Sequence, residues 1–74
     1  MMTIAQQIQQ VLRTKGHSSS AVVQTLGNNT LQVSCSTSDE PNVNTVMNMI
    51  NAWNLKAETR VGNSVIKTYK GDHH

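Results

Sequence analysis

Residues 21–36 read AVVQTLGNNTLQVSCS, and this stretch decides the fold that we expect. The run Gly27-Asn28-Asn29 marks a turn, because these residues adopt positive φ at low cost. After the turn, apolar residues alternate regularly with polar ones, which is typical of a half-buried strand. A two-residue turn at Asn28-Asn29 then predicts a β-hairpin. Its buried face would carry Val22, Gln24, Leu26, Leu31, Val33 and Cys35.

The opposite face of this hairpin has no charged residue. It would carry Ala21, Val23, Thr25, Gln32, Ser34 and Ser36. Two helices can cover only one side of a sheet, so we expect this neutral side to be open. An open face or edge of this kind is a natural surface for pairing with another chain. We therefore expect a homodimer, with Val23, Thr25, Gln32 and Ser34 in its interface.

An amphipathic helix is expected over residues 3–15, before the hairpin. Thr3 and Gln6 have the spacing of a capping box, and Gly16 is placed to end the helix in a left-handed conformation. The apolar stripe follows the helical period. It consists of Ile4, Ile8, Val11 and Leu12.

A second helix is expected to open at Ser38-Asp39-Glu40-Pro41 and to end near Asn54, since acids and proline are favoured in a first turn. Its buried stripe would be Val43, Val46, Met47 and Ile50. Met49 and Trp53, four residues apart, lie toward the edge of this stripe. Trp and Met are enriched at the centres of interfaces. The pair therefore either closes the rim of the core or contacts a protein partner.

Residues 56–70 predict a second hairpin around Gly62-Asn63, with Glu58 opposite Lys67. Its inner face would carry Ala57, Thr59, Val61 and Ile66. Its outer face would carry Lys56, Glu58, Arg60, Val65, Lys67 and Tyr69. A group of cations beside one aromatic ring has the composition of a modest nucleic-acid-binding surface. The cations are Lys56, Arg60, Lys67 and Lys70, and the ring is Tyr69. An ordinary solvated sheet face has the same composition.

The helix–hairpin pattern occurs twice, at a shift of 35 residues without gaps. Unit one covers about 3–36 and unit two about 38–70. Four strands under two helices make a workable core, whereas a lone hairpin does not. The sequence therefore predicts one α+β domain over residues 1–74, an αββαββ pseudo-repeat with a four-stranded antiparallel sheet and two helices packed on one face. The tail 71–74 is expected to be frayed.

No catalytic arrangement stands out in the sequence. Cys35 alternates inward with its apolar neighbours, which favours a buried thiol over a nucleophile. His17, His73 and His74 lack the ligand spacing of a zinc site. Helix capping accounts for Asp39 and Glu40, and a cross-strand lysine accounts for Glu58. We therefore expect no enzyme activity, no metal and no cofactor.

Composition narrows the class of protein further. The chain has 74 residues and a net charge of +2, and 14% of its residues are charged. No apolar run approaches the roughly 20 residues of a membrane span, and a single cysteine fits a reducing, cytoplasmic location. We expect a small non-catalytic binding or regulatory protein, of adaptor or inhibitor type, that acts through protein–protein contact. The alternative is a nucleic-acid-binding regulator that uses the basic face of the second hairpin.

Overall fold

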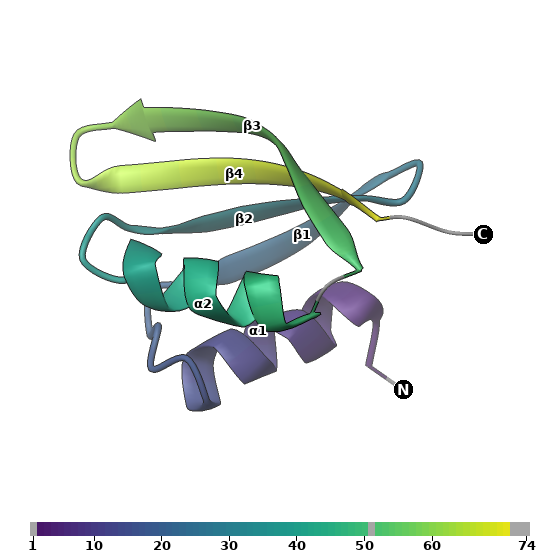
Figure 1. The fold of residues 1–74 in the computed structure, drawn as a ribbon, viewed down its shortest axis with the longest axis horizontal. Helices are drawn as coiled ribbons and strands as arrows, with labels where there is room; N and C mark the ends of the chain where they lie inside the picture. The colour runs from purple at the N-terminus through teal and green to yellow at the C-terminus, as the bar shows by residue number, and fades with distance from the viewer. Residues whose placement is uncertain (1, 51, 72–74) are drawn as a thin grey trace.

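Two helices pack on one face of a four-stranded antiparallel sheet, as the ribbon in Figure 1 shows. This computed structural model describes residues 2–50 and 52–71. The elements are α1 (Ile4–Thr14), β1 (Val22–Gly27), β2 (Thr30–Ser36), α2 (Glu40–Ile50), β3 (Trp53–Val61) and β4 (Ser64–Gly71). The predicted α+β class, element order and single-sided helix layer are confirmed.

The strand order β1-β2-β4-β3 places the second strand of each hairpin at the centre of the sheet. The two αββ units are thus related by an approximate two-fold arrangement. The gapless shift of 35 holds in the helices, where buried Ile8 corresponds to buried Val43. In the central strands the inward positions are related by a shift of 34, so that Leu31 corresponds to Val65. The predicted alignment is therefore one residue out in the strands.

Helix α1 begins with the predicted capping box, in which Thr3 and Gln6 each accept from the other's backbone N–H. Its end differs from the prediction, because His17 adopts the positive φ of 53° and Gly16 does not. Gly16 is required for a different reason. A Cβ there would lie 2.8 Å from the Leu12 carbonyl oxygen and 3.0 Å from Val46 Cγ2. The glycine therefore lets the end of α1 approach α2 closely.

The first hairpin has the predicted turn but not the predicted register. Asn28 and Asn29 form the turn with φ of 49° and 59°, and Gly27 pairs with Thr30. The pairing then slips by one residue at Leu26, which forms a β-bulge. An extra residue in one strand turns every side chain beyond it to the other face.

The bulge exchanges the two faces of β1. Val23 pairs with Val33 and is buried, as is Ala21. The predicted core residues that face outward instead are Val22, Gln24 and Leu26. The physical reason is Gln24, because the predicted register would bury its amide against Val33, and an unsatisfied buried amide is costly. Exposing Leu26 is the smaller penalty.

The second hairpin has the predicted turn and pairing, but its faces are reversed. Glu58 pairs with Lys67, and the strands close around Gly62-Asn63, as predicted. The residues of β4 that face the helices are Val65, Lys67 and Tyr69, and all three are buried. The predicted inner residues Ala57, Thr59, Val61 and Ile66 lie on the other face. Burial of Val65 and Tyr69 decides which face of β4 is turned toward the helices. Lys67 is buried with them, and α2 supplies polar partners for its ammonium.

Three further differences concern the ends of elements. Helix α2 ends at Ile50, and Trp53 is the first residue of β3 instead of part of the helix. Gly71 is not frayed, since it ends β4, where its N–H donates to the Asn29 carbonyl at 2.9 Å. The rest of the predicted frayed tail, 72–74, lies outside the described residues. In the part of the chain that the structure describes, no helix has the length and apolar character needed to cross a membrane.

Candidate protein-interaction site

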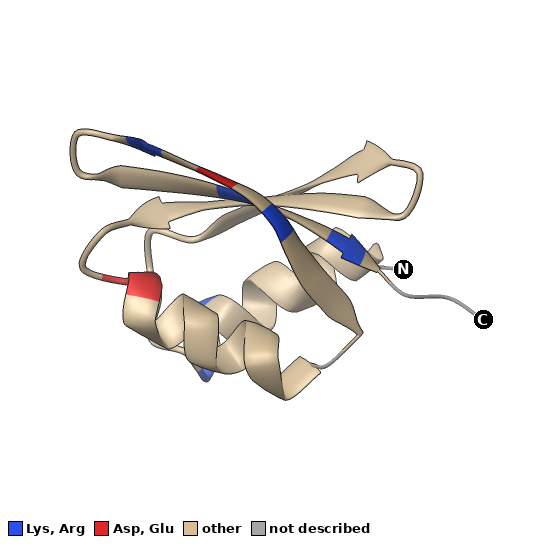
Figure 2. Cartoon of the chain, turned by 45° about the horizontal axis from the view of Figure 1, so that its top comes forward, with Lys and Arg blue, Asp and Glu red and all other residues tan. Residues whose placement is uncertain are grey.

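The residues predicted to form a basic platform do not share an exposed face. Arg60, Lys67 and Tyr69 lie on the helix-covered face of the sheet, and Lys67 is only 3% exposed. Figure 2 shows basic residues on β3 and β4 above the start of α2, whose first turn carries the acidic Glu40. Lys70 is exposed on the opposite face, and Lys56 lies at a second β-bulge, in β3. The assignment of this face as an outer surface was therefore wrong.

Lys67 is held by three oxygen-bearing groups. Its Nζ donates to Asn44 Oδ1 at 2.6 Å and lies 3.0 Å from Glu40 Oε2 and 3.4 Å from Glu58 Oε1. A buried ammonium is tolerated when it is paired and hydrogen-bonded in this way. Two of these groups come from α2 and one from β3, so the lysine joins the helix layer to the sheet.

Arg60 completes the same charge cluster. Its guanidinium donates to both carboxylate oxygens of Glu40, at 2.9 and 2.6 Å, and its Nε donates to Glu58 at 2.7 Å. The hydrogen bonds from Arg60 and then Lys67 lower the pKa of Glu40 below its usual value. We call Glu40, Glu58, Arg60 and Lys67 the charge cluster. Two acids balance two bases in it, so it presents little net charge to an anion.

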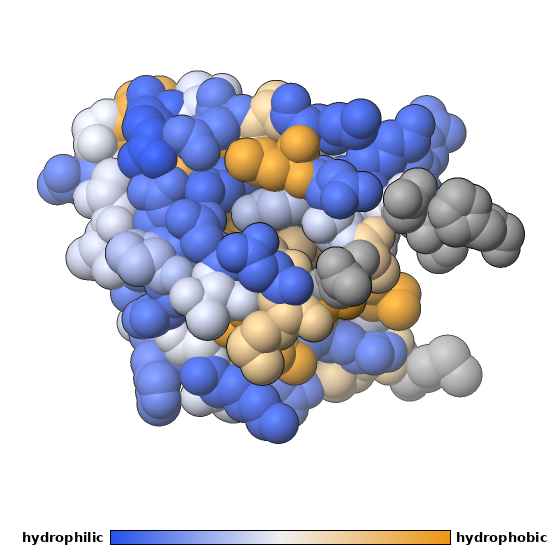
Figure 3. Space-filling view, in the orientation of Figure 1, coloured by the Kyte–Doolittle hydropathy of each residue, from blue (hydrophilic) through white to orange (hydrophobic). Residues whose placement is uncertain are grey.

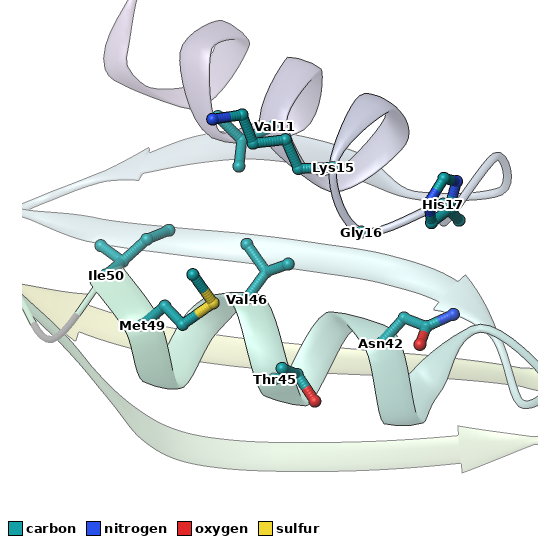
Figure 4. Close-up of a pocket in the computed structure, with 9 residues that line it drawn as sticks. All are labelled: Val11, Lys15, Gly16, His17, Asn42, Thr45, Val46, Met49 and Ile50. Atoms are coloured by element: carbon teal, nitrogen blue, oxygen red, sulfur yellow. The ribbon is translucent and has the colours of Figure 1, made fainter.

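An apolar surface lies between the two helices. Two cavities of about 390 and 230 Å³ follow one another along the antiparallel helices α1 and α2, and Val11 and Ile50 line both. In Figure 4, Val11 points toward Val46 and Ile50 across this space. We call this surface the interhelical groove. The large apolar residues that line it are Ile4, Ile8, Val11, Val46, Met49, Ile50 and Trp53.

Several of these residues are open to solvent. Met49 is 77% exposed and Ile4 is 54% exposed, although both are large apolar residues. Figure 3 shows apolar colour over the C-terminal half of α2, continuing toward the start of α1. The sequence pointed to Met49 and Trp53 as interface candidates, whereas Ile4 and Val11 were expected only as part of the apolar stripe of the first helix. The breadth of the apolar stripe on α1 could have indicated their exposure, because a helix with so wide a stripe cannot bury every apolar position against a small sheet.

Trp53 lies between core and surface. It is half-buried, packs against the core, and lines both the groove and a third cavity of about 340 Å³. Thr25 lines that third cavity too. It therefore lies on the helix side of the sheet, and Val23 is buried. Neither residue is on the open face where the homodimer interface was expected.

The open face of the sheet is nevertheless neutral in its middle. Gln32 and Ser34 lie there as predicted, half-buried between neighbouring strands. Their cross-strand neighbours on β4 are Thr68 and Ile66, and on β1 they are Gln24 and Val22. The face therefore consists of short polar and aliphatic side chains, with Lys70 at one end.

Two reactive side chains of the described residues, Cys35 and Asp39, are buried or hydrogen-bonded within the fold. Cys35 is buried, as predicted, and burial followed by the negative charge of Glu40 raises its thiol pKa. Asp39 accepts from the Ser20 N–H at 3.1 Å and from the Ser20 hydroxyl at 2.6 Å, and these bonds lower its carboxyl pKa. Among residues 2–50 and 52–71, no group of three or more His, Cys, Asp or Glu side chains is placed to hold a metal ion.

Comparison of the chain with protein-family models, with curated proteins and with solved structures finds no match.

Proposed function

We propose that this protein is a non-catalytic protein-interaction module, of adaptor or inhibitor type, that binds its partner through the interhelical groove. The observation that carries the proposal is the exposure of large apolar side chains along one continuous groove. Contiguous apolar patches of this kind mark interaction sites on soluble domains. Methionine suits such a surface, because its flexible side chain adapts to the shape of a partner.

The geometry lends less support to nucleic-acid binding. Arg60 and Lys67 direct their charge into the charge cluster, and Tyr69 is buried. A stacking platform needs exposed rings and cations that reach phosphates. The proposed cytoplasmic adaptor, by contrast, binds its partner without using any of these three residues.

We further propose that the open sheet face pairs with a second copy of the chain. In a two-fold dimer the same patch meets itself, so a patch of like charges would repel. No such repulsion arises in the middle of this face, because its residues are uncharged. These residues are Gln32, Ser34, Ile66 and Thr68. The predicted homodimer then leaves both interhelical grooves facing outward.

The groove is tested by capture of cellular partners on immobilised wild-type protein and on two variants. Met49→Asp places a charge in the groove. Ser19→Asp is the control, because Ser19 is also exposed but lies outside both the groove and the sheet. We expect capture to be lost with Met49→Asp, kept with Ser19→Asp and unaffected by nuclease.

Two results would contradict the groove proposal. Partners retained by Met49→Asp would show that binding lies elsewhere. Capture that disappears after nuclease treatment or at high salt would instead favour the nucleic-acid alternative. Circular dichroism of both variants establishes that each is folded before capture is compared.

Sedimentation equilibrium tests the homodimer. We expect a dimer that Ser34→Arg dissociates, since the substitution places two cations near the centre of the shared face. Ser19→Arg, at an exposed position outside the sheet, should leave the dimer intact. A monomer at every concentration that stays in solution would remove this part of the proposal.

A further inference from the structure

The length of the interhelical groove suggests the shape of what fills it. Helices α1 and α2 have 11 residues each, or about 16 Å at 1.5 Å per residue. Because the two cavities share Val11 and Ile50, the groove is continuous along this length. A third helix of about three turns would lie along it, with its apolar side chains between those of the two walls.

The charge of the groove limits the choice of helix. Lys15 and His17 line its end beside the C-terminus of α1, and the described residues that line the two cavities include no Asp or Glu. The sequence of α1 has no acid, and Arg13 in its last turn is directed away from the groove, where its Nε donates to the Ala21 carbonyl at 2.9 Å. The single acid of α2, Glu40, is turned toward Arg60 and Lys67. The formal charge around the groove is therefore positive.

A second copy of the chain does not offer the complementary charge. Glu40 and Glu58 belong to the charge cluster, and Asp39 is hydrogen-bonded to Ser20. Asp72, the remaining acid in the sequence, lies outside the described residues. The groove of a second copy also carries the same lysine, Lys15. A partner of different sequence is thus the better complement.

We infer that the interhelical groove binds an amphipathic helix whose polar face is acidic. This inference rests on the proposed function and names the chemistry of its partner. The apolar stripe of that helix contacts Ile4, Val11 and Met49, and its acids lie beside Lys15 and His17. Complementary charge of this kind mainly sets specificity and the rate of association.

The test uses two synthetic helical peptides that share one apolar stripe and differ only in having glutamate or lysine on the polar face. Trp53, the single tryptophan of the chain, lines the groove and reports binding by fluorescence. We expect the acidic peptide to bind about tenfold or more tighter than its basic twin at low salt, and added salt to narrow the difference. Lys15→Glu should weaken binding of the acidic peptide about fivefold. Lys56→Glu, at the bulge in β3, is the matched control and should have no effect.

The outcomes separate this inference from the proposed function. Equal binding of both peptides, lost in Met49→Asp, would overturn the acidic preference while leaving the groove as a binding site. Tighter binding of the basic peptide would also overturn the acidic preference and leave the groove as a binding site. If neither peptide binds but cellular partners are still lost with Met49→Asp, the groove remains a binding site and its partner is not an acidic helix. If Met49→Asp changes neither peptide binding nor partner capture, both proposals fail.

Discussion

Lys67 shows how a charged residue can take a core position at the scale of a single side chain. Its neighbours across the sheet are Val33 and Glu58, and its ammonium lies between two carboxylates and an amide. Alternation alone could not predict this burial, because two of the three groups around the ammonium, Asn44 and Glu40, come from α2, more than twenty residues earlier in the chain. The partners, and not the residue type, decide its location.

Replacement of Lys67 by Met should destabilise the fold by about 1–2 kcal/mol. Methionine fills the space of the lysine stem, so the loss comes from removal of the ammonium from Glu40 and Asn44. It stays below the roughly 3–5 kcal/mol of a fully broken buried ion pair, because Arg60 still binds both glutamates. Chemical denaturation measures the change.

Lys70→Met is the control for this prediction, since Lys70 is on the same strand but exposed. Its unfolding midpoint should match that of the wild type. A Lys67→Met protein at least as stable as the wild type would mean that the charge cluster does not hold α2 to the sheet.

Tyr69 should make stability depend on pH at the alkaline end. Burial raises the pKa of its phenol from 10.0 to about 12. The unfolded state therefore loses this proton at lower pH than the folded state. The free energy of unfolding should hold below pH 10 and fall as the pH rises from 10 toward 12.

The chain has one tyrosine, so its phenolate absorbance reports this residue alone. We expect the native protein to titrate near 12 and the protein in denaturant near 10. A native titration at the ordinary value would show that Tyr69 is not covered by the helices. The substitution Tyr69→Phe should remove the alkaline loss of stability.

At the scale of elements, local signals predicted much of the fold. The capping box, both turn sites, the two helices and the Glu58–Lys67 pair follow from residues close together or directly opposed. The faces of the hairpins did not follow, because one bulge at Leu26 reverses β1 and the α2 partners of Lys67 are distant in sequence. For the groove, the sequence identified Met49 and Trp53 as interface candidates but not Ile4 and Val11. Whether Ile4 and Val11 are buried depends on how far apart the helices lie, and a stripe on one helix does not give that distance.

A pair of substitutions distinguishes the observed β1 register from the one first expected. Val23 is 7% exposed and Leu26 is 51% exposed. Val23→Ala should therefore cost about 1–2 kcal/mol in unfolding free energy, whereas Leu26→Ala should change it by less than about 0.5 kcal/mol. The register without the bulge predicts the reverse order, so urea denaturation of the two variants decides between them.

At the scale of the whole molecule, the two αββ units share one sheet, and its two edge strands are protected from pairing in different ways. The edge strand β1 is covered by α1, since the Val23 N–H donates to Gln9 Oε1 and Arg13 Nε donates to the Ala21 carbonyl. The other edge, β3, is interrupted by the bulge at Lys56 and carries three charged side chains. Bulges and charges of this kind discourage edge-to-edge pairing. A second copy is therefore better accommodated on the open face than on an edge.

Amide hydrogen exchange tests this arrangement. The slowest exchange should occur in β2 and β4, because each is paired on both sides, and β3 should exchange faster. A dimer through the open face adds no backbone hydrogen bond, so dilution below the dimer range should leave the order of exchange rates unchanged. Pairing of two β3 edges would instead add hydrogen bonds along that strand and slow its amides at high protein concentration. Protection of β3 that rises with concentration would thus place the second copy at the edge and leave the neutral face open to solvent.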